Sequence, residues 1–93
     1  MPRYLIERIF SVDENEMSRI GRRSNQVKEE HFPEIVWEHS HVVVDDAGTV
    51  KTYCVYSAPD LDAVRRHAAE LGEHNLGWIQ EIAGDVTPAD FPL

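Results

Sequence analysis

The stretch of sequence that decides the fold is IVWEHSHVVVDDAGTVKTYCVY, residues 35–56. Its two halves are rich in β-branched and aromatic residues, which favour extended chain, and Asp45-Asp46-Ala47-Gly48 separates them. Aspartate and glycine in such a cluster are typical of a tight turn. The sequence therefore predicts a strand over residues 35–44, a turn, and a strand from about Val50 to Tyr56, paired as a hairpin.

A strand and a helix are predicted before this hairpin. Residues 3–10 are rich in Tyr, Leu, Ile and Phe and predict a strand. The segment that follows carries a narrow apolar stripe at helical spacing, and Pro33 closes it. The stripe consists of Met17, Ile20, Ser24 and Val27.

A second helix and a last strand are predicted after the hairpin. Asp60 is a typical N-cap and Gly72 suits the position that follows a helix. The apolar stripe between them consists of Leu61, Val64, Ala68 and Leu71. Residues 78–83 then predict a strand, and residues 85–93, which contain two prolines, predict an irregular tail.

The resulting order of elements, β-α-β-β-α-β, is the ferredoxin-like pattern. It predicts an α+β fold in which two helices lie on one face of a four-stranded antiparallel sheet, and we expect residues 1–93 to form one such domain. The strand over residues 35–44 has large apolar side chains on both faces, whereas two helices cover only one face. We therefore predict a homodimer through the open sheet face, packed as a dimeric α+β barrel. The smaller aliphatic side chains suit the helix side, which directs Trp37, His39 and His41 toward the open face.

Composition indicates which binding partners and which cellular compartment to expect. The 93 residues carry a formal net charge of -8, which argues against a nucleic-acid partner because such proteins need clustered Lys and Arg. No apolar run approaches the roughly 20 residues that span a bilayer, so we expect no membrane partner. The single cysteine, Cys54, excludes an internal disulfide, and no leader opens the chain, so we expect a cytoplasmic protein.

The most informative candidate site is the pair His39 and His41. Side chains two residues apart in a strand share a face, with Cα atoms about 7 Å apart, so both imidazoles can reach one metal ion. Imidazole suits nickel, copper and zinc. The alternative interpretation is two polar strand residues that form hydrogen bonds across the dimer.

Two further residues are candidate metal ligands. Glu7 interrupts an apolar strand, where a carboxylate is costly unless it is paired or functional; the alternatives are a ligand or general base and an ion pair with an arginine. His67 lies at the border of the second helix's apolar stripe, where it is either a ligand or a half-buried packing residue.

A different hypothesis assigns an enzyme to the same fold. Dimeric sheets of this type enclose pockets, and one for a small apolar substrate would be lined by Glu7, Trp37, His39, Cys54 and Tyr56. Glu7 or His39 would then act as general base in a cofactor-free isomerase or monooxygenase-like reaction. Cys54 has its own alternative, a small buried hydrophobic residue in a strand.

Four segments in a characteristic order carry a family resemblance. They are Arg3-Tyr4-Leu5-Ile6-Glu7-Arg8, Trp37-Glu38-His39-Ser40, Tyr53-Cys54-Val55-Tyr56-Ser57-Ala58-Pro59-Asp60 and Val64-Arg65-Arg66-His67-Ala68. In these segments the chain resembles the small bacterial DUF4242 family, whose best-known member is described as a nickel-binding protein. The resemblance implies a ferredoxin-like fold, a dimer, and Ni²⁺ binding connected with sequestration or detoxification. The chain departs from that family at His41, where the family more often has an aromatic residue such as tyrosine.

The favoured hypothesis from the sequence is thus a binding protein for Ni²⁺ or a similar divalent ion, rather than an enzyme. His39 and His41 are its first ligands, with Glu7 and His67 as further ones.

Overall fold

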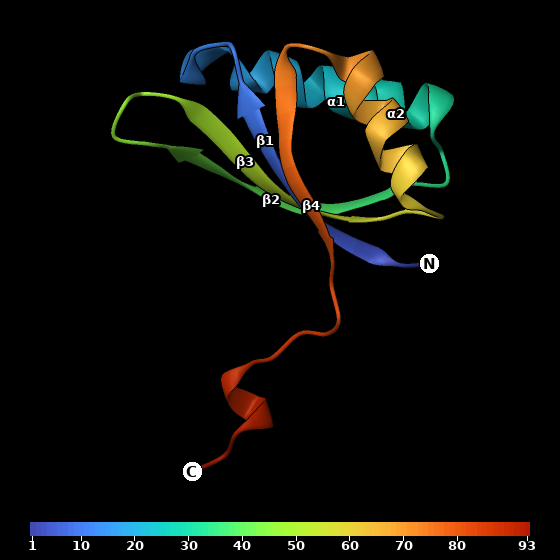
Figure 1. The fold of residues 1–93 in the computed structure, drawn as a ribbon, viewed down its shortest axis with the longest axis vertical. Coiled ribbons are helices and arrows are strands. Elements are labelled where there is room, and N and C mark those ends of the chain that lie inside the picture. Colours follow the sequence, from blue (N-terminus) through green and yellow to red (C-terminus); the bar gives the residue numbers. More distant parts are fainter.

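The computed structural model describes residues 1–93 and contains the predicted elements in the predicted order. The strands are β1 (Arg3–Phe10), β2 (Val36–Val44), β3 (Val50–Ser57) and β4 (His74–Glu81), and the helices are α1 (Met17–His31) and α2 (Leu61–Leu71). Short 3-10 helices lie at Glu14–Glu16 (η1) and Pro88–Asp90 (η2). The strands are antiparallel in the order β2-β3-β1-β4, and both helices cover one face of the sheet (Figure 1). This is the expected ferredoxin-like α+β fold.

Alternation along the two central strands builds the core. Every second side chain of β1 and β3 is buried beneath the helices, and these are Tyr4, Ile6, Arg8, Phe10, Val50, Thr52, Cys54 and Tyr56. The helices contribute Ile20, Ser24 and Val27 from α1 and Ala63, Val64, His67, Ala68 and Leu71 from α2. Arg8 is the one fully charged side chain in this core, and it is only 2% exposed.

The ends of α2 follow from its sequence, and they displace the start of the next strand. The Asp60 side chain accepts a hydrogen bond of 2.9 Å from the backbone N–H of Ala63, as an N-cap should. Gly72 and Glu73 both have positive φ, 69° and 62°, and turn the chain back within two residues. β4 therefore begins at His74, four residues before the predicted start at Trp78, and only Gly72 and Glu73 connect α2 to β4.

Two β-bulges decide which side chains share a face. One interrupts the pairing of β2 with β3 between Trp37 and His39, and the other interrupts the pairing of β1 with β4 between Glu7 and Arg8. A bulge adds one residue to one strand and so reverses the alternation beyond it. The expectation that Trp37 lies on the open face is wrong for this reason: Trp37 pairs with the buried Tyr56 and packs against the helix-side core.

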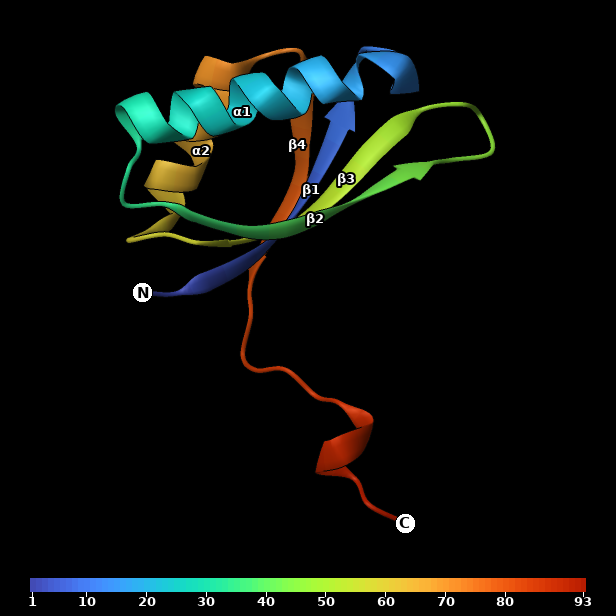
Figure 2. The same cartoon turned by 180° about the vertical axis from the view of Figure 1, so that it is seen from behind.

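Beyond the bulge the expected faces are confirmed. His39, His41 and Val43 lie opposite Val55, Tyr53 and Lys51, whose side chains are on the open face. Ser40, Val42 and Val44 are on the helix side, yet Val42 is 52% and Val44 43% exposed, because α1 does not cover this edge of the sheet (Figure 2). Val42 lines a cavity between α1 and this part of the sheet.

The open face carries exposed apolar side chains, and the dimer inferred from it stays a prediction. Val36, Val43 and Trp78 are 38–49% exposed there. Residues after β4 extend away from the domain (Figure 1), with Phe91 65% exposed and η2 as the one regular segment of the tail predicted over residues 85–93. Neither helix is long and apolar enough to cross a membrane.

Candidate functional site

His39 and His41 lie side by side on the open face. Both are exposed, and their ring centres are 5.4 Å apart with the rings nearly perpendicular. Neither ring has a hydrogen bond or ion pair within the chain, although the rings of all three other histidines have at least one such contact. Their nitrogens are therefore available to an external ligand.

Glu7 lies in the same row of the open face as His41. The register pairs Glu7 with Tyr53 and Tyr53 with His41, so two strand spacings of about 4.8 Å separate the backbones of Glu7 and His41. The Tyr53 phenol donates a hydrogen bond of 3.0 Å to Glu7 Oε2, and this bond, with burial, raises the pKa of Tyr53. Glu7 forms no ion pair, so the ion-pair alternative for this residue is wrong.

Gly77 leaves the space that the Glu7 side chain occupies. A Cβ atom at Gly77 would overlap the Glu7 carboxylate and stand 2.8 Å from its Cδ. A glycine inside a strand often marks a bulge or a close approach, and both are present here. The Glu7 carboxylate is thus held between Tyr53 and the backbone of β4.

Glu38 is on the open face as well but is already engaged. Arg3 binds its carboxylate through Nε at 2.8 Å and Nη2 at 3.1 Å, and Ser57 contributes a hydrogen bond of 3.3 Å. Arg3 also pairs with Asp85 of the tail at 2.8 Å. The hydrogen bond from Arg3 lowers the pKa of Glu38, so this carboxylate stays ionised and paired.

The four candidate metal ligands do not converge within one chain. His67 is fully buried between the helices on the other side of the sheet, where its Nε2 lies 3.1 Å from the Ser24 carbonyl oxygen. No group of three or more His, Cys, Asp or Glu side chains is placed to hold one metal ion. The sheet therefore separates His67 from His39, His41 and Glu7. The surroundings of His67 are those of a packing residue, and its ring is fully buried rather than half-buried.

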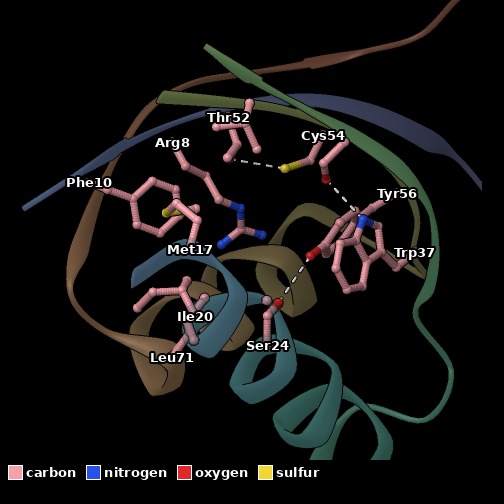
Figure 3. Close-up of a pocket in the computed structure, with 13 residues that line it drawn as sticks. Arg8, Phe10, Met17, Ile20, Ser24, Trp37, Thr52, Cys54, Tyr56 and Leu71 are labelled. Atoms are coloured by element: carbon pink, nitrogen blue, oxygen red, sulfur yellow. Dashed lines mark hydrogen bonds between the residues drawn. The ribbon is translucent and has the colours of Figure 1, made fainter. Parts of the chain in front are cut away.

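The residues of the enzyme hypothesis are divided between two faces. Glu7 and His39 lie on the open face, whereas Trp37, Cys54 and Tyr56 line a cavity on the helix side (Figure 3). These five residues cannot line one pocket. Cys54 is 4% exposed and its thiol donates to Thr52 Oγ1 at 3.3 Å, which fits its interpretation as a small buried residue.

The cavity has a volume of about 230 Å³ and lies between α1 and the β1, β2 and β3 strands. Most of its lining is apolar, from Phe10, Met17, Ile20, Trp37, Val42 and Leu71. Hydroxyl groups of Ser24, Ser40, Thr52 and Tyr56 interrupt this lining. The Arg8 side chain extends from β1 into the middle of the cavity, as Figure 3 shows.

Arg8 is the residue that the sequence interpretation missed. Its Nη1 lies 2.9 Å from His74 Nε2, its guanidinium carbon lies 5.2 Å from the centre of the Tyr56 ring, and its Nε and Nη2 are buried with no partner. Strand alternation gives the signal that would have found it, because residues 4, 6, 8 and 10 share a face and the other three are large and apolar.

The imidazole beside Arg8 is neutral. His74 Nδ1 donates to the Gly72 carbonyl oxygen at 2.6 Å, which leaves the Nε2 lone pair to accept from Arg8. Burial lowers the pKa of His74, and the nearby Arg8 charge lowers it further. Arg8 therefore has no counter-charge in the cavity.

Comparison with family models identifies a match over most of the domain. The model described as "Nickel responsive protein SCO4226-like" matches residues 4–82, from β1 to just beyond β4. This match confirms the expected resemblance to a family connected with nickel. The family carries this description and not the name DUF4242. No curated protein matches the chain.

Solved structures share the fold at low sequence identity. The C-terminal domain of the MgtC protein from Mycobacterium tuberculosis has a TM-score of 0.60 at 13% identity, with 90% of this chain and 88% of that chain covered. The de novo designed protein Foldit4 has a TM-score of 0.57 at 11% identity, with 91% and 100% covered. A formyltetrahydrofolate deformylase from Burkholderia mallei ATCC 23344 has a TM-score of 0.56 at 16% identity, and the match covers 90% of this chain but 30% of the deformylase. At these identities the likeness concerns the fold alone.

Proposed function

Because the chain belongs to the nickel responsive protein SCO4226-like family, we propose that it binds nickel or a similar divalent ion and serves in sequestration or detoxification. The observation that carries the proposal is the pair of exposed imidazoles of His39 and His41, 5.4 Å apart on the open face. Imidazole nitrogen is a good donor to Ni²⁺, and exposed rings without partners in the chain lose no hydrogen bond when they bind a metal.

One chain supplies only half of the donors that such a site needs. Two imidazoles without a third ligand make a weak site, and no third His, Cys, Asp or Glu completes it within the chain. A second copy packed against the open face would add its own His39 and His41. We therefore place the metal between two copies of the chain, with Glu7 as a nearby carboxylate in the same row as His41.

The apolar side chains of the open face support the same arrangement. Val43 follows the two histidines along β2, and Trp78 lies on β4 at the opposite edge of the sheet; both are about two-fifths exposed. Burial of these groups against a second copy contributes about 25 cal/mol for each Å² removed from water. A cytoplasmic location is part of the proposal and is supported by Cys54, a free thiol with no disulfide partner.

The test is a calorimetric titration of the tag-free protein with Ni²⁺, beside His39→Ala/His41→Ala and His31→Ala. His31 is the matched control, because it is an exposed histidine at the end of α1 whose ring contacts Glu70 on the helix side. We expect the double variant to lose more than about 100-fold in affinity, since even outer-shell partners of metal-binding histidines are worth 10- to 100-fold. The His31 variant should bind as the wild type does.

Sedimentation with and without Ni²⁺ tests the second half of the proposal. A dimer whose dissociation constant falls when nickel is added is expected, because a metal shared between copies stabilises their association. Nickel affinity that survives in the double variant would refute the assignment to His39 and His41. Stoichiometric binding by a protein that remains monomeric would refute the shared site.

A further inference from the structure

Arg8 is a buried cation that no acidic residue of the chain neutralises. Its side chain is buried, its hydrogen-bonded partner is the neutral ring of His74, and it forms no ion pair. Burying a cation without a partner is costly, and the face of the Tyr56 ring offsets only part of that cost. The chain has 17 acidic residues, yet none of them reaches this guanidinium.

The two free nitrogens of Arg8 form one edge of its guanidinium, and the protein itself shows what fits that edge. Arg3 uses the same atoms, Nε and Nη2, to bind both oxygens of the Glu38 carboxylate at 2.8 and 3.1 Å. In Arg8 this edge is buried and has no partner. Water would supply acceptor atoms, but only an anion supplies acceptors and neutralises the charge.

We infer that the cavity between α1 and the sheet is a binding site for a small monocarboxylate with an apolar body, and that Arg8 binds its carboxylate through Nε and Nη2. The hydroxyl groups of Ser24 and Tyr56, 3.4 Å apart, lie on the cavity wall as further polar contacts. The ligand enters where α1 leaves β2 uncovered, beside the half-exposed Val42.

The volume and lining of the cavity set the class of ligand. A dry apolar cavity of about 150 Å³ accommodates benzene in another protein, and this one has about 230 Å³, which leaves room for a carboxylate as well. The apolar groups Phe10, Ile20 and Leu71 line it beside Arg8. An aromatic acid of benzoate size therefore matches both the charge and the shape.

This site is independent of the proposed metal site. The cavity opens on the helix side of the sheet, and His39 and His41 point to the other side. Loss of nickel binding would leave the inference intact, and loss of carboxylate binding would leave the nickel proposal intact.

The test is binding of benzoate to the full chain, measured by calorimetry and by NMR of ¹³C-methyl methionine. Met17 lines the cavity, and the only other methionine is the exposed Met1, so one methyl signal reports on the site and the other serves as an internal reference. We expect benzoate to bind and to shift the Met17 signal, and benzyl alcohol, which has the same body without the charge, to bind at least about tenfold more weakly.

Arg8→Met and Arg22→Met form the matched pair of variants. Arg22 is exposed on α1 and lies outside the cavity lining, so its variant should bind benzoate as the wild type does. Arg8→Met should lose at least about tenfold in affinity, because a charge-assisted bidentate contact is removed.

A second variant keeps the charge of Arg8 and fills the cavity. Gly21 lines the cavity, and a Cβ built there meets nothing within 4 Å, so Gly21→Leu places a side chain in the cavity and favours the helix. We expect it to remain folded and to exclude benzoate. No shift of the Met17 signal at millimolar benzoate would overturn the inference, as would equal binding by Arg8→Met or by benzyl alcohol.

Discussion

Acidification from about pH 7.5 to about pH 5 should remove about 2 kcal/mol of folding stability through one side chain, His67. The ring is fully buried between α1 and α2, where it contacts Phe32 and Tyr56 edge to face. Its Nε2–H donates to the Ser24 carbonyl oxygen, and its Nδ1 is buried without a partner. No acceptor is therefore placed to bind a second proton on Nδ1.

The size of the effect follows from the pKa of His67 in the two states. Burial lowers this pKa from 6.5 to about 4; the hydrogen bond to the Ser24 carbonyl opposes the shift, and the charge of Arg8 adds to it. A histidine whose pKa is lower in the folded state contributes stability above pH 6.5 and loses it as the pH falls toward 4, because the unfolded chain binds the proton first. The full loss is about 3 kcal/mol, and about 2 kcal/mol of it falls above pH 5.

The assay is urea unfolding at several pH values between 5 and 7.5 for the wild type and His67→Gln. Glutamine keeps a donor for the Ser24 carbonyl but cannot titrate, so the free energy of unfolding of the variant should fall by about 2 kcal/mol less than that of the wild type over this range. Other groups, His74 among them, titrate in both proteins and cancel in the difference. Equal pH dependence of the wild type and His67→Gln would refute this reasoning.

Two further substitutions test the geometry around the sheet. Gly77→Ala should displace the Glu7 carboxylate, break its hydrogen bond to Tyr53 and lower the pKa of Tyr53 toward its ordinary value, which ultraviolet titration of tyrosinate measures; an unchanged titration would contradict the close packing. Asp60→Ala should remove the cap that accepts from the Ala63 N–H and cost about 1 kcal/mol in urea unfolding, and a cost near zero would contradict the role of the cap.

Each of these substitutions has a control in the same chain. Gly84→Ala adds a methyl group where nothing lies within 4 Å, and it should leave the Tyr53 titration unchanged. Asp62→Ala removes an exposed carboxylate of α2 that pairs with Arg66 one turn later, and such a pair is worth only about 0.3–0.5 kcal/mol.

The parts of the fold that could be predicted are those that depend on residues close together in the sequence. Asp60 and Gly72 define α2 through an N-cap and a positive φ, and both act as predicted. The turn at residues 45–48 closes through hydrogen bonds to the Asp45 side chain, as a turn aspartate allows. The start of β4 was missed because Glu73, a residue with no special preference for positive φ, continues the turn that Gly72 begins.

The candidate site was harder to predict because bulges depend on pairing between strands. No residue in Val36-Trp37-Glu38-His39 marks the position at which the alternation reverses, so the sequence assigns Trp37 to the wrong face. Glu38 was the visible difficulty, since a carboxylate on the helix side would be buried without compensation. The bulge removes that difficulty by bringing Glu38 to Arg3 on the open face.

The same alternation rule that failed in β2 would have succeeded in β1. From Arg3 to Phe10 the buried and half-buried side chains alternate without exception, so Arg8 had to lie in the core with Tyr4 and Ile6. An arginine is an unusual core residue unless it is paired. The sheet consequently has two distinct chemistries: exposed imidazoles that suit a cation on the open face, and a buried guanidinium that needs an anion on the helix side. Because one layer of backbone separates them, His39→Ala/His41→Ala should weaken nickel binding and leave benzoate binding unchanged, and Arg8→Met should do the reverse.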